Sequence, residues 1–84
     1  MMQAVAEEHL GETLKAIRQA KHLSLREVAG EQVSIAQLSR FERGLSTLSV
    51  FSFYHCLTNM DLDFADFQYL LTKFQAGIEL EFEA

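Results

Sequence analysis

Helix-start signals recur at short intervals along the chain and constrain its fold more than any other feature. A short polar side chain followed three positions later by an acid or an amide is the signature of a capping box, in which each side chain satisfies a free backbone amide of the first turn. Pairs of this kind include Ser24 with Glu27, Ser34 with Gln37, and Asp63 with Asp66, each just before a stretch of helical periodicity. The chain is therefore expected to form several short helices.

The spacing of apolar residues between these signals predicts five helices. Residues 9–20 place Leu10, Leu14 and Ile17 on one helical face, and Gly44 supplies the left-handed residue that ends the third helix. The predicted helices cover residues 9–20, 25–30, 35–43, 50–57 and 64–74. We expect an all-α, five-helix domain whose core contains Leu14, Ile17, Val28, Leu38, Phe41, Phe53, Leu57, Leu62 and Phe67.

The last stretch, residues 77–83, alternates apolar and acidic side chains with the period of a strand. A single strand has little to pair with, so this stretch could pair with a symmetry mate, extend the fifth helix or be the frayed end of a longer protein. We therefore divide the chain into a flexible N-terminus (1–8), a folded domain (9–74) and a tail (75–84) that is a dimerisation segment or a truncated linker.

The charge of the chain is unevenly distributed. A net charge of -5 argues against a nucleic-acid partner, because lysine and arginine supply most of the affinity for phosphates. Residues 9–44, however, hold six of the seven cations against four acids, a local balance of +2. Residues 45–84 hold six acids against one cation. Charge is thus polarised along the chain, and the first half can still bind DNA.

Several classes of function are excluded by what the chain lacks. A chain of 84 residues builds one core and no deep catalytic cleft, and its start carries no basic region before an apolar stretch. The uncharged stretch 45–57 is too short to span a bilayer. Cys56 is the only cysteine, and it has no base placed to activate it. We expect a cytoplasmic protein that is not an enzyme and has no metal site or cofactor.

Two segments carry a family resemblance. Residues 25–29 (LREVA) followed by 38–44 (LSRFERG) resemble the XRE or phage-repressor type of helix-turn-helix. Within that superfamily, the run 33–44 (VSIAQLSRFERG) is most similar to the N-terminal DNA-binding domain of Rgg regulators, and the likeness covers about residues 10–70.

The resemblance implies a repressor-like fold and a role in transcription. Rgg regulators respond to peptides through a large helical-repeat domain, which this chain does not contain, so a peptide effector is expected only if such a C-terminal domain is missing here. In phage-repressor relatives the pair matching Arg18 and Glu42 joins the first helix to the third as a partly buried ion pair, and the same structural role is implied for these two residues.

The third predicted helix has the side chains that a recognition helix needs. Glutamine can pair with adenine, arginine with guanine, and small apolar side chains with thymine methyls, so the expected base contacts are Ile35, Ala36, Gln37 and Arg40. Ile35 could instead be a staple or core residue. Helix starts and cations are natural phosphate sites, which makes Lys15, Ser24, Arg26, Ser34 and Arg43 the expected phosphate contacts.

Apolar residues in the second half exceed what one small core can bury, and such a surplus marks an interface. The expected dimer surface consists of Phe51, Tyr54, Tyr69, Phe74, Ile78, Leu80 and Phe82. A dimer would place two recognition helices about 34 Å apart on double-stranded DNA. The leading prediction is thus a sequence-specific DNA-binding transcription regulator, or its isolated DNA-binding domain, acting as a homodimer.

Two alternatives remain open at this point. The first is a small antitoxin or phage-type repressor, in which the same fold binds DNA and the acidic C-terminal stretch docks a protein partner. The second is a protein-interaction module that kept the fold and lost its affinity for DNA, which the net charge of -5 favours. Acidic residues around the exposed face of the third helix would decide for the interaction module.

Overall fold

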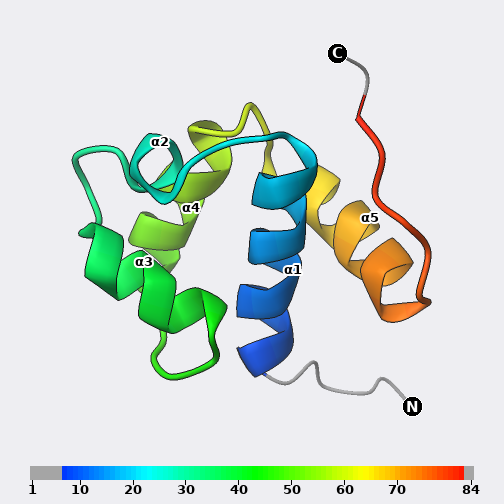
Figure 1. Cartoon of the computed structure of the whole chain (residues 1–84), viewed down its shortest axis with the longest axis horizontal. Coiled ribbons are helices and arrows are strands. Elements are labelled where there is room, and N and C mark those ends of the chain that lie inside the picture. The colour runs from blue at the N-terminus through cyan, green and yellow to red at the C-terminus, as the bar shows by residue number, and fades with distance from the viewer. Residues whose placement is uncertain (1–6, 83–84) are drawn as a thin grey trace.

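The computed structural model describes residues 7–82, with side chains from residue 9 onward. These residues form five helices and no strand, which confirms the predicted all-α class. The helices are α1 (Glu7–Ala20), α2 (Leu25–Ala29), α3 (Ile35–Glu42), α4 (Val50–Thr58) and α5 (Phe64–Gln75). The central helix α1 packs against α3 and α5, while α2 packs against α3 and α4 (Figure 1).

The capping signals form as predicted at two helix starts and by half at a third. Both reciprocal bonds are present at Ser24, which begins α2, and at Asp63, which begins α5. At Ser34 the hydroxyl oxygen accepts the Gln37 amide at 3.0 Å, but the Gln37 side chain makes no return bond within the described part of the chain. The side-chain amide of Gln37 is therefore available for other hydrogen-bond partners.

Four of the five helices end in the same kind of turn. A residue two or three positions after the helix has a positive φ, and the next backbone amide donates to a carbonyl in the last helical turn, as in a Schellman motif. At the end of α3, for example, Gly44 has φ 75° and the Leu45 amide donates to the Arg40 carbonyl at 2.9 Å. The other three positions are His22, Asp61 and Gly77, with φ between 59° and 76°.

The core lies between the five helices and contains most of the expected residues. Phe53 and Leu62 are exceptions, because both are half-buried at its margin. The Phe53 ring meets Phe41 and Phe67 edge-on and has Phe64 on another side. Six residues outside the predicted core list complete it: Ala29, Val33, Cys56, Met60, Leu70 and Leu71.

A close approach of backbones fixes the distance between α1 and α3. Gly11 of α1 is buried against the Phe41 backbone, and a methyl group in place of its hydrogen would overlap the Phe41 carbonyl oxygen. Only glycine fits there without movement of a helix. Gly11 therefore sets how deeply α3 sits beside α1.

The tail turns back at Gly77 and neither extends α5 nor forms a strand. Residues 78–82 return beside α5 towards the end of α1 (Figure 1). Leu80 and Phe82 are half-buried against the chain's own core, and the Lys21 ammonium lies 4.8 Å from the Phe82 ring centre. These two side chains were expected on a dimer surface, but they pack largely against other residues of the same chain.

Parts of both predicted terminal segments fall outside the described residues. Of the N-terminal segment 1–8, only residues 7 and 8 are described, and they form the first turn of α1. Residues 83 and 84 of the predicted tail also lie outside the described range.

Candidate nucleic-acid interface

Helix α3 is divided into an inner and an outer face. Leu38, Phe41 and Glu42 point inward and are buried. The outer face carries the four expected base-contact residues: Ile35, Ala36 and Arg40 are exposed, and Gln37 is half-buried. Ile35 is 39% exposed and so is not a core residue, whereas Val33, one position before the capping serine, is buried.

The single carboxylate of α3 is neutralised in the interior. Glu42 accepts from Arg18 twice, from Nε to Oε2 at 2.8 Å and from Nη2 to Oε1 at 3.0 Å. A third bond runs from Arg18 Nη1 to the Leu23 carbonyl at 3.0 Å. The Glu42 side chain is 3% exposed, so the expected ion pair is present and well buried. It ties α1 to α3 and leaves no acid on the outer face of α3.

The starts of α2 and α3 differ in their suitability for a phosphate. Glu27 receives hydrogen bonds from the Ser24 backbone amide and hydroxyl, and these bonds lower its pKa, so a carboxylate stands at the start of α2. A phosphate there would meet a like charge. The first turn of α3 contains no acid, and its free amides make Ser34 the better anion position.

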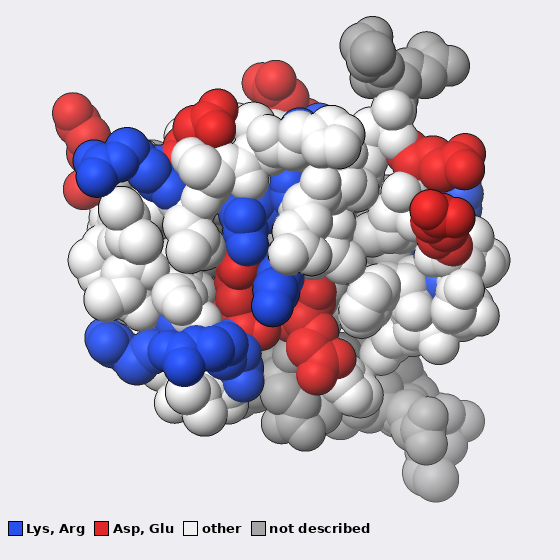
Figure 2. All heavy atoms as spheres, in the orientation of Figure 1, with Lys and Arg blue, Asp and Glu red and all other residues white. Residues whose placement is uncertain are grey.

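Four exposed cations surround the outer face of α3, namely Lys15 of α1, Arg26 of α2 and Arg40 and Arg43 at the end of α3. Lys15 and Arg43 line one open groove between α1 and α3, with Glu12 also on its wall. Figure 2 shows lysine and arginine over the part of this face that Figure 1 assigns to α2, α3 and α1, with acids among them and further acids near the tail. The structure thus brings two of the expected phosphate contacts, Lys15 and Arg43, together at one groove.

Two further residues that position α2 were not expected from the sequence. Asn59, at the end of α4, donates from Nδ2 to the Val28 carbonyl at 2.9 Å. Gly30, after α2, has φ 60°, and a side chain there would press on Asn59. Because Asn59 lies 31 positions from its partner, no local pattern could have revealed this contact.

The fold and this surface define a class. Helices α2 and α3, joined by the turn 30–34, form a helix-turn-helix unit, and the five-helix arrangement is that of a small gene regulator. The chain is similar to the clp gene regulator ClgR from C. glutamicum, with a TM-score of 0.70 and 28% sequence identity over 94% of this chain and 97% of that chain. No protein-family model matches the chain. None of the described helices is long and apolar enough for a membrane span.

Proposed function

We propose that the protein is a transcription regulator that binds operator DNA with the outer face of α3 in the major groove. The observation that carries this proposal is the charge of that face. It presents Arg40 and Arg43 to solvent, while its one acid, Glu42, is buried and paired with Arg18. An interaction module that had lost DNA affinity would be expected to carry acids here, and it is not favoured.

The side chains on this face have the chemistry for reading bases. The Gln37 amide, free of the return capping bond, can pair with adenine, and Arg40 can pair with guanine O6 and N7. Ile35 and Ala36 can rest against thymine methyls. The DNA phosphates flanking these bases would be bound by Lys15, Arg26, Ser34 and Arg43. Ser24 would contribute less, because the Glu27 carboxylate beside it repels a phosphate.

The proposal extends to family and assembly. The LSRFERG segment and the buried Arg18–Glu42 pair support membership of the XRE superfamily, with Rgg regulators as the nearest resemblance. The net charge of residues 9–44 is only +2, which gives one copy a modest affinity for DNA. Two copies would therefore bind together on a two-fold operator. Function would then be exercised in the cytoplasm on double-stranded DNA.

Salt dependence separates the two kinds of contact. We would select a duplex from a randomised pool and titrate it by fluorescence anisotropy at several salt concentrations. Arg43→Ala should weaken binding to every duplex and reduce the slope of log affinity against log salt by about 1. Gln37→Ala should keep the slope and relax preference at one base pair by about 1–3 kcal/mol.

Lys73→Ala is the matched control, because this cation lies on α5, where its ammonium stacks on Tyr69 at 4.8 Å. The control should leave both affinity and slope unchanged. Equal losses for Arg43→Ala and Lys73→Ala would contradict a phosphate-binding role for the α3 side.

A further inference from the structure

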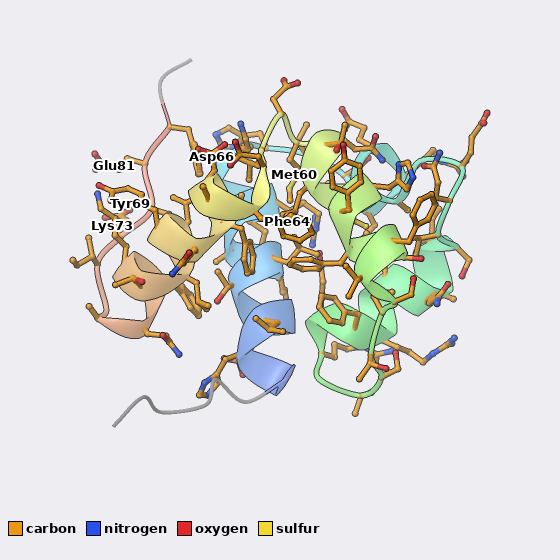
Figure 3. All side chains as sticks on the ribbon, turned by 180° about the vertical axis from the view of Figure 1, so that it is seen from behind. Met60, Phe64, Asp66, Tyr69, Lys73 and Glu81 are labelled. Atoms are coloured by element: carbon orange, nitrogen blue, oxygen red, sulfur yellow. The ribbon has the colours of Figure 1, made fainter. Side chains whose placement is uncertain are left out.

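An exposed apolar face covers α4 and the start of α5. It consists of Val50, Phe51, Tyr54 and Phe64, whose side chains are 75%, 69%, 45% and 47% exposed, and we call it the aromatic face. The Tyr54 and Phe64 rings are 5.9 Å apart, so the two helices contribute to one continuous surface. Figure 3 looks onto this side and shows Phe64 where the start of α5 approaches α4.

The α4 part of this face has no charged side chain, whereas the exposed acids Asp61, Asp63 and Asp66 flank Phe64 at the start of α5. The stretch 45–60 contains no lysine, arginine, aspartate or glutamate, although the whole chain has a net charge of -5. Two copies of a chain with this net charge repel each other least where they meet through neutral side chains. The neutral α4 part of the face therefore favours a second copy of this chain over a charged partner.

The other apolar candidates are less suitable. Leu80 and Phe82 are half-buried within the chain, and the Tyr69 ring, although 60% exposed, has the Lys73 ammonium 4.8 Å from its centre. In Figure 3 Tyr69 lies beside Lys73 and near Glu81 of the tail, away from Phe64. The tail side is therefore charged and partly occupied.

The aromatic face is large enough to form the centre of a dimer interface. A Phe or Tyr side chain contributes about 150–250 Å² when fully buried, so the exposed parts of these four residues amount to roughly 400 Å². A stable interface buries about 800 Å² per partner around an apolar centre. Adjoining neutral residues of the stretch 45–60 can supply the rim.

We propose that a second copy docks on the aromatic face by a two-fold contact and that the tail is not part of the interface. This inference deepens the proposed function, because α4 follows α3 after the short loop 43–49 and a contact on α4 would connect the two recognition helices directly. Phe51 and Tyr54 are the anchors contributed by α4, and Phe64 is the anchor from α5.

The test is sedimentation equilibrium without DNA on the whole chain and on matched variants. Phe51→Glu places a charge in the centre of the face, and a glutamate in the first turn of α4 is compatible with the helix. Tyr69→Glu is the control, at a similarly exposed aromatic residue outside the face. Circular dichroism on each sample verifies that the helices are retained, and Tyr54→Glu provides a second variant in the face.

We expect the parent and Tyr69→Glu to form dimers with the same dissociation constant, and the two variants in the face to raise it by about 100-fold or more. A monomeric parent would overturn the inference, and so would folded Phe51→Glu and Tyr54→Glu proteins that dimerise like the parent. Dissociation by Tyr69→Glu alone would move the interface to the tail side. A parent that is monomeric yet binds DNA refutes only this interface, whereas a Phe51-dependent dimer that binds no duplex refutes only the proposed function.

Discussion

Removing the positive partner of Glu42 should be among the most costly single changes outside the apolar core. Both Glu42 oxygens accept from Arg18, and the carboxylate side chain is 3% exposed. Arg18→Met leaves this charge buried without compensation, which costs about 3–5 kcal/mol. Small domains have about 5–15 kcal/mol in total, and each lost kcal/mol lowers Tm by about 4–8 °C at this size.

Urea denaturation followed by far-UV circular dichroism measures the effect, with two further variants as references. Arg18→Met combined with Glu42→Leu removes both charges and should regain most of the loss, because apolar replacements of a buried pair are often neutral. Arg26→Met, at an exposed arginine of α2, should stay within about 0.5 kcal/mol of the parent. An Arg18→Met protein within 1 kcal/mol of the parent, or a double variant no more stable than the single one, would refute the reasoning.

Four more predictions concern the packing that positions α2 and α3. Gly11→Ala should destabilise by about 1–3 kcal/mol, as overpacking does, and an unchanged urea midpoint would show that α1 and α3 can separate freely. Phe41→Ala should cost about 3–5 kcal/mol, which the same titration measures, and a melt near the parent temperature would place Phe41 outside the core. Burial, and less so the Glu42 charge, raise the pKa of Cys56 from 9.0 to about 11. Stability should therefore be retained below pH 9 and fall as pH rises towards 11, where only the unfolded thiol ionises, and a Cys56→Ala protein should lack this step. Asn59→Ala should cost about 1–3 kcal/mol by leaving the Val28 carbonyl unpaired, whereas hydrogen exchange at α2 equal to the parent's would contradict that role.

Local features were predictable from the sequence because their partners lie within one helical turn. The capping boxes at Ser24 and Asp63 and the turn at Gly44 belong to this class. The return of the tail over α1, with Phe82 beneath Lys21, depends on packing between distant segments, and alternation of side chains alone suggested a strand.

The candidate site likewise has features that local sequence predicts and features that depend on contacts between distant residues. The outward position of Arg40 follows from helical periodicity, whereas Ile35 lies three positions before the buried Leu38, so periodicity left its position open. The Arg18–Glu42 pair was suggested by family resemblance, since no spacing rule links residues 24 positions apart. The close contact of Gly11 with the Phe41 backbone has no sequence signature.

The central claim, that the outer face of α3 binds DNA, is tested most directly by one titration at low salt. A randomised pool of labelled duplexes is titrated by anisotropy with the folded parent protein and with Arg40→Glu, which reverses one exposed charge on that face. The account predicts binding by the parent, weakening with salt, and its loss in Arg40→Glu while the circular dichroism spectrum is unchanged. A folded parent that binds no duplex at low salt would contradict the account and favour a protein-interaction module.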